Sequence, residues 1–236
     1  MQFRLFETAV YTRRRSQLIK KMSSGLIILM GNEESSMNYK DNWYPFRQDS
    51  NFLYYFGINT GSLAAVIDAD SGEEIIFGNE LTIEDIVWTG PLPSLGEMAA
   101  AVGVSKTKPY NQIETIIRNA INSGRQIYFT PPYRPENKIK LAQWLQVAVD
   151  AVSEMASVLL IKAIISQRES KEECEVEEMH KASIISADMH LAAMRYAKAG
   201  MKEYEVMAKV KEAAYAQNAS LSFHPIVTIH GETLHN

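Results

Sequence analysis

The sequence predicts an α/β protein built on a mixed sheet. Short apolar runs of strand length alternate with helical stretches along the first two thirds of the chain, and one pair of runs is separated by a turn short enough for an antiparallel hairpin. Of the 236 residues, 46% are hydrophobic and 22% are charged, which is typical of a chain that folds around a sizeable core and not of a disordered one.

The first elements follow from periodicity and composition. Arg13–Met22 predicts a basic amphipathic helix, and the apolar run Leu26–Met30 predicts a buried strand. Asn51–Phe56 is rich in aromatic residues and predicts another strand, with Phe52 and Tyr54 on one face. Ser62–Asp68 and Glu74–Phe77 flank an Asp-Ser-Gly turn and therefore predict the hairpin.

The same patterns predict five further elements before residue 162. They are helices at Thr82–Trp88, Gln112–Asn122 and Ile139–Val149, and strands at Gln126–Phe129 and Ser157–Ile161. Asn111 is the expected cap of the second helix.

The character of the chain changes near Ile164. From Ser170 to Lys198 there is no Gly or Pro, and apolar residues recur every three or four positions, so a long helix is expected, ended by Gly200. A second helix and a strand at Phe223–Ile229 follow. We therefore predict two regions, residues 1–165 and 166–236, of which the second is too short to enclose a core of its own.

Charge and cysteine content exclude several classes of protein. The net charge of −4 gives no electrostatic attraction to nucleic acid or to an anionic membrane, so we expect neither partner. Cys174 is the only cysteine and cannot form an internal disulfide. No apolar run approaches the length of a membrane span, and charges interrupt the N-terminal region where a signal peptide would be apolar. These features predict a cytoplasmic protein.

The residues alone do not supply a complete active site. Phosphate-binding loops, dinucleotide fingerprints, nucleophile elbows and His-Glu-x-x-His are all absent from the sequence. His180 and His190 fall on different faces of the long helix, and His224 and His230 lack a nearby carboxylate, so surface histidines are the favoured interpretation. The glutamates between residues 172 and 178 are best explained as a solvated face near the positive end of that helix.

Several segments resemble one family when they are taken in order. Phe46-Arg47-Gln48-Asp49-Ser50-Asn51-Phe52-Leu53-Tyr54-Tyr55-Phe56-Gly57 is similar to the R-x-x-S-x-F-x-Y signature in the N-terminal domain of the creatinase/prolidase/aminopeptidase P family. The strand Gly61–Ile67 and the step Val87-Trp88-Thr89-Gly90-Pro91 continue the resemblance. The helix that follows Lys171-Glu172 and the stretch from Phe223 to Asn236, which ends in a Leu-His pair, resemble the opening of the catalytic domain.

The resemblance implies a fold and an activity. The expected fold is the ribonuclease H-like N-terminal domain of the family, followed by two helices and the first strands of an incomplete "pita-bread" domain. The aminopeptidase P branch fits best, and its enzymes remove an N-terminal residue that precedes proline. They use two divalent ions, usually manganese, held by two Asp, one His and two Glu.

In the family, all five metal ligands lie downstream of the first Leu-His histidine, which here is His235. No aspartate follows Asp188, so we expect this chain to bind no metal and to be inactive by itself, whether it is a truncated piece or ends early. His235 would correspond to the family histidine that contacts the substrate and stabilises charge in the transition state, although a frayed terminal residue is the physical expectation without its sheet.

Two further positions carry over from the resemblance. Trp88 matches an aromatic residue that leans toward a neighbouring subunit's active site; a tryptophan packed on its own domain is the alternative. Arg47 is expected to be structural, with a substrate contact as the less favoured role, and with Asn51 it would tie down the incoming loop by hydrogen bonds.

The expected partners are proline-containing peptides and further copies of the chain, as a homodimer or tetramer. An apolar stripe on the two last helices (Met179, Met189, Val206 and Val210) should be shielded by self-association. Three alternatives stay open: a catalytically silent peptide-binding or oligomerisation module of the same family, an Xaa-Pro dipeptidase, and a creatinase-type hydrolase.

Overall fold

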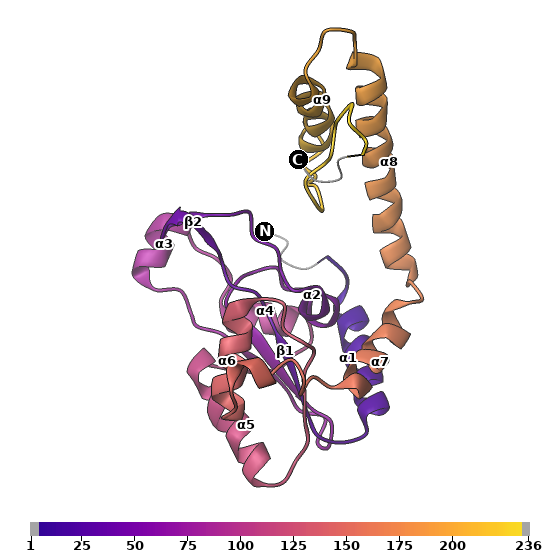
Figure 1. Ribbon diagram of the computed structural model, residues 1–236. Helices are drawn as coiled ribbons and strands as arrows, with labels where there is room; N and C mark the ends of the chain where they lie inside the picture. Colours follow the sequence, from indigo (N-terminus) through magenta and orange to yellow (C-terminus); the bar gives the residue numbers. More distant parts are fainter. Residues whose placement is uncertain (1–4, 233–236) are drawn as a thin grey trace. The chain divides into compact units, whose positions relative to one another are not determined.

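The computed structural model describes residues 5–232, and contacts divide this part of the chain into an N-terminal unit that ends at Ser170 and a C-terminal unit that begins at Lys171 (Figure 1). The predicted boundary between residues 165 and 166 falls inside helix α7, which belongs to the N-terminal unit.

The N-terminal unit alternates helices and strands. Its helices are α1 (Thr8–Met22), α2 (Ser50–Phe56), α3 (Ile83–Thr89), α4 (Leu95–Ala101), α5 (Ile113–Asn122), α6 (Pro135–Leu145) and α7 (Val158–Arg168), with 3₁₀ turns at Tyr110–Gln112 and Val149–Ala151. Its strands are β1 (Leu26–Met30), β2 (Ser36–Tyr39), β3 (Asn42–Trp43), β4 (Ala64–Asp68), β5 (Glu74–Phe77), β6 (Lys106–Lys108) and β7 (Ile127–Tyr128).

The central sheet is mixed, which confirms the predicted class. Within residues 5–232 it has five strands in the order β6-β5-β4-β1-β7. β4 pairs antiparallel with both β1 and β5, whereas β7 runs parallel to β1 and β6 runs parallel to β5. The predicted hairpin is present, with Ala64 opposite Phe77 and Ile67 opposite Glu74.

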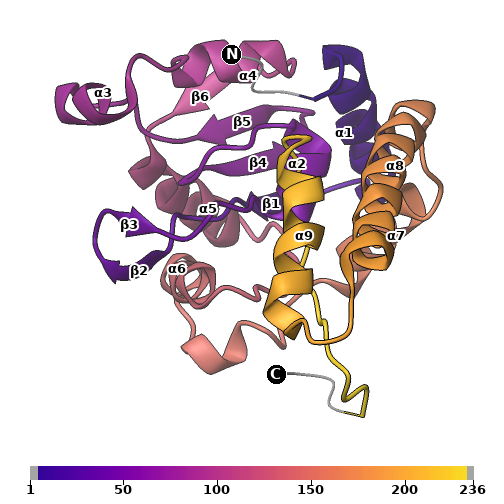
Figure 2. The ribbon, with the colours of Figure 1, turned by 90° about the horizontal axis from the view of Figure 1, so that it is seen from above.

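Helices cover both faces of this sheet (Figure 2). Ile27 and Leu29 pack in a core with α1, α2, α4 and α7, whereas Leu26 and Ile28 pack in a second core with α5 and α6. Successive strand residues point to opposite faces, and both faces are buried. This explains why β1 is an unbroken apolar run instead of an alternating one.

The predicted strand at Asn51–Phe56 is wrong, because these residues form helix α2. The carboxylate of Asp49 accepts hydrogen bonds from the backbone amides of Asn51 (2.8 Å) and Phe52 (2.9 Å), which caps the start of the helix. Gly57 adopts a left-handed conformation at the other end, with φ of 65°. The two caps prevail over the β propensity of the aromatic residues, which are buried from one turn of the helix to the next.

The predicted strand at Ser157–Ile161 is also wrong. The Ser157 hydroxyl accepts a hydrogen bond from the backbone amide of Leu160 (3.1 Å) and starts helix α7, in which Leu160, Ala163 and Ile164 are buried. A short apolar run is compatible with a helix as well as with a strand, and here it packs against α1 as a helix.

Other boundaries differ in detail. Helix α5 begins after Gln112, without a side-chain cap from the expected Asn111. Helix α6 starts four residues before Ile139, at Pro135, a residue well suited to the first turn. The short helix α4 and the strands β2, β3 and β6 were not predicted; the strands are mostly exposed and lack an apolar period.

Two arginines of α1 are buried, against the expectation of a basic helix with a solvated polar face. Arg14 (1% exposed) donates to the carbonyl oxygen of Tyr54 at 2.9 Å, and Arg15 (0% exposed) donates to that of Tyr55 at 2.8 Å. Both carbonyls lie in the last turn of α2, where helical partners are missing. The arginines therefore cap α2 and tie it to α1.

The C-terminal unit contains the two predicted helices, α8 (Glu173–Tyr196) and α9 (Glu203–Tyr215), which pack on each other with Val210 and Ala214 buried. Helix α8 ends at Tyr196, before the expected stop at Gly200. The predicted strand at Phe223–Ile229 is wrong, since these residues form no strand; no described segment of this unit offers a neighbouring strand to pair with them.

Candidate functional site

No metal centre is found among the described residues. Within residues 5–232, no group of three or more His, Cys, Asp or Glu side chains is placed to hold an ion. His180 and His190 are exposed on α8, and the glutamates at its start cap the helix, with the Glu175 carboxylate accepting from the amide of Glu172 at 3.0 Å. None of the described helices is long and apolar enough to cross a membrane.

Trp88 lies on the short helix α3, where it is 84% exposed. Thr82 and Asp85 form a capping box: the Asp85 carboxylate accepts from the Thr82 amide at 2.8 Å, and the Thr82 hydroxyl accepts from the Asp85 amide at 3.2 Å. Hydrogen bonds from Thr82 hold the pKa of Asp85 below its ordinary value. The helix is thus fixed locally while Ile83, Val87 and Trp88 face solvent, and the packed alternative for Trp88 does not hold within the described residues.

Arg47 lies in the segment that leads into α2. Its guanidinium donates to the Ser50 hydroxyl at 3.3 Å, and its carbonyl oxygen accepts from the side-chain amide of Asn32 at 2.7 Å. Asn51 was expected to tie down the same loop, but its side-chain oxygen instead accepts a hydrogen bond from Arg168, at the end of α7.

The neighbour of Arg47, Gln48, is buried and holds this segment in place. Its side-chain nitrogen donates to the carbonyls of Ile58 (3.2 Å) and Thr60 (2.7 Å), and its side-chain oxygen accepts from the amides of Asn32 (2.8 Å) and Asp49 (2.9 Å). Four hydrogen bonds on one buried amide satisfy all of its polar capacity. An exposed arginine therefore projects from a rigid loop.

A pocket of about 440 Å³ opens beside this loop, and we call it the Arg47 pocket. It is lined by Asn32, Glu33, Ser35, Tyr44, Pro45, Phe46, Arg47, Tyr133 and Arg134. Trp88 is not among its lining residues, so the structure does not bring the two candidates of the N-terminal unit together.

Two of the three charged groups that line the Arg47 pocket, Glu33 and Arg134, are held in ion pairs. Arg134 donates to the carbonyl of Glu33 at 2.7 Å and pairs with Glu136 at 2.9 Å, while the Glu33 carboxylate pairs with Lys140. Burial raises the pKa of nearby Glu34, and Arg134 opposes that rise. Sequence reasoning missed Asn32 and Tyr133 as lining residues. The available signal was the pair of breaks, Gly-Asn after β1 and Pro-Pro after β7, because loops after parallel strands meet at one sheet edge.

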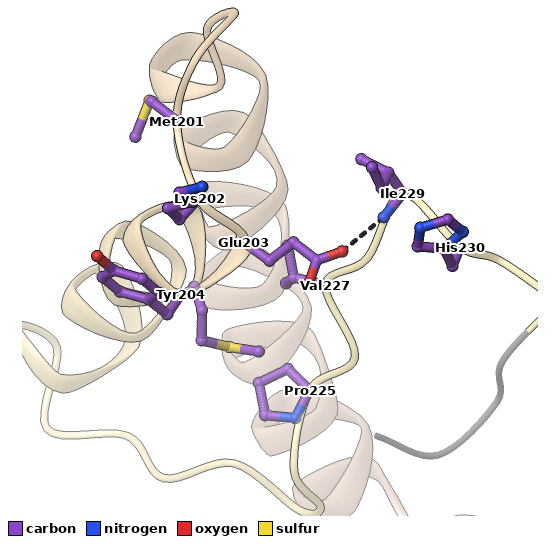
Figure 3. Close-up of a pocket in the computed structure, with 9 residues that line it drawn as sticks. Met201, Lys202, Glu203, Tyr204, Pro225, Val227, Ile229 and His230 are labelled. Atoms are coloured by element: carbon purple, nitrogen blue, oxygen red, sulfur yellow. Dashed lines mark hydrogen bonds between the residues drawn. The ribbon is translucent and has the colours of Figure 1, made fainter.

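A second pocket, of about 670 Å³, lies in the C-terminal unit between the start of α9 and the segment from Pro225 to His230 (Figure 3). The Glu203 carboxylate accepts from the backbone amide of Ile229 at 2.8 Å. Hydrogen bonds from Thr228 and Ile229 lower the pKa of Glu203. This carboxylate thus holds the segment that precedes the Leu234-His235 pair in the sequence.

The histidines of this region do not form a cluster. His230 places Nδ1 3.2 Å from a Glu232 carboxylate oxygen, and His224 is exposed elsewhere on the segment. His235 lies outside the described residues.

Comparison with known proteins supplies the family context. The sequence profile of the aminopeptidase P N-terminal domain matches residues 11–128, and that of metallopeptidase family M24 matches residues 177–236. The chain is 24% identical to the Xaa-Pro dipeptidase of Homo sapiens over 89% of its own length and 43% of that protein. It is 26% identical to the probable Xaa-Pro aminopeptidase pepP of Metarhizium acridum, over 92% of its length and 43% of the relative.

Solved structures show the same fold. The aminopeptidase PepP of Pseudomonas aeruginosa superposes with a TM-score of 0.74 at 24% identity, over 91% of this chain and 50% of that one. Aminopeptidase P from E. coli gives 0.74 at 19% identity, over 90% and 50%. The chain thus spans about half the length of the relatives that it matches, and the N-terminal domain profile matches before the M24 profile along the chain.

Proposed function

This chain belongs to the aminopeptidase P-like M24 metallopeptidase family, and from this premise we propose that it is the N-terminal half of a metal-dependent Xaa-Pro aminopeptidase. The observation that carries the proposal is the consecutive match of two family profiles, at residues 11–128 and 177–236. The substrate would be a peptide with proline in second place, cleaved between its first residue and that proline.

The metal chemistry is proposed for the remainder of such an enzyme. Two divalent ions, manganese in the first instance, would there supply a bound hydroxide and polarise the scissile carbonyl. The described residues of this chain do not fit such a centre, because none of their carboxylate and imidazole groups converge in threes. We assign no chemical step to them and propose that these 236 residues alone do not hydrolyse peptides.

The test compares this chain with the product of a longer reading frame, if one extends past Asn236. Both are assayed with Mn²⁺ on Ala-Pro-Ala, with Ala-Ala-Ala as the matched control substrate. We expect the longer protein to release alanine from the first peptide only, and the 236-residue chain to release none. Proline-dependent turnover by the chain itself, or none by the longer protein at saturating Mn²⁺, contradicts the proposal.

A second candidate activity is that of an Xaa-Pro dipeptidase. Its support is the human Xaa-Pro dipeptidase, which matches 89% of the chain at an identity comparable with that of the aminopeptidases. The free carboxylate of a dipeptide distinguishes the two: an aminopeptidase cleaves Ala-Pro-Ala faster than Ala-Pro, and a dipeptidase does the opposite.

We further propose a cytoplasmic homodimer or tetramer in which Trp88 reaches a neighbouring subunit and His235 contacts the substrate. The exposed apolar side chains of α3 support a contact at Trp88. The predicted stripe on the last helices supports self-association only in part, since Met179 is 57% exposed but Val210 is buried within its own unit. Light scattering on the purified chain, with a Trp88→Ala variant beside it, measures the contribution of α3: we expect wild type to associate and the variant to shift toward monomer.

A further inference from the structure

The Arg47 pocket lies where an open α/β sheet favours ligands. Strands β1 and β7 are parallel, with Leu26 opposite Ile127, so their carboxyl ends face the same edge. The chain segments that leave these ends, at Asn32 and at Tyr133–Arg134, form two walls of the pocket, and the segment before α2 forms the third. Ligands of open sheets bind outside the carboxyl ends of parallel strands, and 440 Å³ lies within the usual range for binding pockets.

One wall carries an unused hydrogen-bond acceptor. Asn32 is 2% exposed, and its side-chain nitrogen donates to the Arg47 carbonyl (2.7 Å) and to the Tyr133 hydroxyl (2.8 Å). A carbonyl cannot donate, so the first of these bonds fixes which end of the amide is nitrogen. The oxygen, Oδ1, is then buried with no partner among the described residues. Leaving such a group unsatisfied is costly, so an outside donor that reached Oδ1 through a small movement of the lining side chains would be stabilised.

The other lining groups have a different character. Tyr44 and Tyr133 are 55% and 67% exposed, and with Pro45 and Phe46 they give the pocket flat apolar surfaces. Arg47 forms no ion pair within residues 5–232, and its guanidinium, with five N–H donors and a single hydrogen bond to Ser50, has donors to spare. The site thus presents rings, an N–H acceptor and N–H donors together.

A peptide main chain that contains prolines meets these requirements. Polyproline II segments are stiff before binding and dock on aromatic-lined grooves, in which prolyl rings pack on tyrosines and carbonyls accept from side-chain donors. A neighbouring residue other than proline supplies the N–H donor. We propose that the Arg47 pocket binds the downstream part of a proline-containing peptide chain in polyproline II conformation. The proposal rests on the proposed function, because it assigns to the N-terminal unit a site for that substrate class.

Anionic ligands fit less well. Arg134 is already paired with Glu136, Glu33 lies in the wall, and the net charge of the chain is −4. An unsatisfied amide oxygen repels a phosphate or carboxylate that approaches it, whereas it favours an amide N–H. A nucleic acid or a free anion is therefore an outcome that would count against the proposal.

The test is a binding experiment on the 236-residue chain. The probe is an N-acetylated decapeptide of five Ala-Pro repeats, and the control peptide has Ser in place of Pro. Acetylation removes the free amino group that an aminopeptidase site requires, so binding here is distinct from substrate binding at a catalytic centre. We expect weak binding of the proline peptide, with the side-chain amide signals of Asn32 shifting in NMR titration, and no shift with the serine peptide.

Two variants locate the site. Tyr44→Ala removes an exposed ring of the pocket, and Tyr39→Ala removes an exposed ring from the same β2–β3 hairpin outside it. One aromatic contact supplies roughly a 2- to 12-fold change in affinity, so Tyr44→Ala should weaken binding by that factor and Tyr39→Ala should leave it unchanged. Equal binding of both peptides, or equal loss in both variants, overturns the proposal. Inorganic phosphate or a DNA oligonucleotide that shifts the Asn32 signals in place of the peptide overturns it too. Turnover by the longer protein is measured separately, so either proposal can fail without the other.

Discussion

Replacement of Arg15 by methionine tests the view that a buried charge organises the N-terminal unit. The guanidinium donates to the carbonyls of Tyr55 (2.8 Å) and Val102 (2.9 Å) and pairs with the Glu74 carboxylate at 2.8 Å. It thus connects α1 to the end of α2, the end of α4 and strand β5. Methionine keeps most of the apolar volume of the side chain and removes all three polar contacts.

The magnitude follows from the groups left behind. Each of the two buried carbonyls loses a donor, at about 1–3 kcal/mol each, and breaking a buried ion pair costs about 3–5 kcal/mol. Burial raises the pKa of Glu74 and Arg15 opposes that rise, so the carboxyl can take up a proton once Arg15 is gone and limit the loss. Together these losses come to about 5–11 kcal/mol, and because protonation of Glu74 limits the ion-pair part, we expect Arg15→Met to lower the free energy of unfolding by an amount near the low end, about 5–6 kcal/mol, a large share of the 5–15 kcal/mol typical of a domain.

The assay is urea unfolding followed by tryptophan fluorescence. Trp43, Trp88 and Trp144 all lie in the N-terminal unit, so the signal reports that unit within the intact chain. Lys20→Met, at an exposed position of the same helix, is the matched control and should change stability by less than about 0.5 kcal/mol. A loss of unfolding free energy below about 1 kcal/mol for Arg15→Met would refute the reasoning, because the two carbonyls and the Glu74 carboxylate would then be satisfied by water at no cost.

Three further outcomes are expected. Gly57→Ala should cost more than about 2 kcal/mol in the same assay, since φ is 65° and the new Cβ would lie 2.1 Å from the Tyr11 ring; a neutral result would mean that α2 can end differently. Burial of the Asp68 carboxyl acts to raise its pKa, but hydrogen bonds from Arg125 outweigh burial and hold the pKa of Asp68 below its ordinary value. The ionised Asp68 carboxylate therefore stabilises the fold above its unfolded-state pKa, and this stability is lost as the pH falls through the folded-state pKa. Asp68→Asn should lower the free energy of unfolding by about 0.5–1 kcal/mol at pH 7 and by nothing at a pH below the folded-state pKa, which urea unfolding at the two pH values measures. Trp88→Ala should leave unfolding within about 0.5 kcal/mol of wild type while it lowers peptide turnover by the longer protein; a large loss of stability would place Trp88 in a core instead.

The sheet was predictable because its strands carry their own signal. Leu26–Met30 and Glu74–Phe77 are apolar, of strand length, and bounded by turn residues, and both are strands with the predicted bounds. The hairpin of β4 and β5 followed from the short turn between the two strands. Strand β6 carries no such signal, since Lys106–Lys108 contains two lysines and joins the sheet edge through backbone pairing with β5.

The helix α2 was not predictable from composition, because four of its seven residues are aromatic. Propensity favours a strand for such a run, but the flanking Asp49 and Gly57 are the residues that cap helices. The capping pair was present in the sequence and carried more information than the aromatic run. The same holds at Ser157, which begins α7.

Buried arginines mark a limit of a different kind. Arg13, Arg14 and Arg15 are identical in type, yet Arg13 is exposed and the next two are almost wholly buried. What separates them is the position of carbonyl groups 40 and 87 residues away along the chain. Periodicity along one helix contains no information on such acceptors, and charged residues are rarely buried unless paired, so a solvated face was the natural prediction.

Helix α2 determines what the motif around Arg47 does. Arg47 and Asn51 were both expected to tie down the incoming loop; in the structure, Asp49 caps the helix, Gln48 is fully hydrogen-bonded, and Asn51 contacts Arg168 on α7. Most of the signature therefore holds backbone in place, and only its first two residues, Phe46 and Arg47, line the pocket. Pre-ordering matters for a weak peptide site, because a rigid loop does not lose conformational entropy on binding. Most residues that carry the family resemblance thus account for rigidity, and the proposed recognition falls to Phe46, to Arg47 and to the less distinctive residues Asn32, Tyr44 and Tyr133.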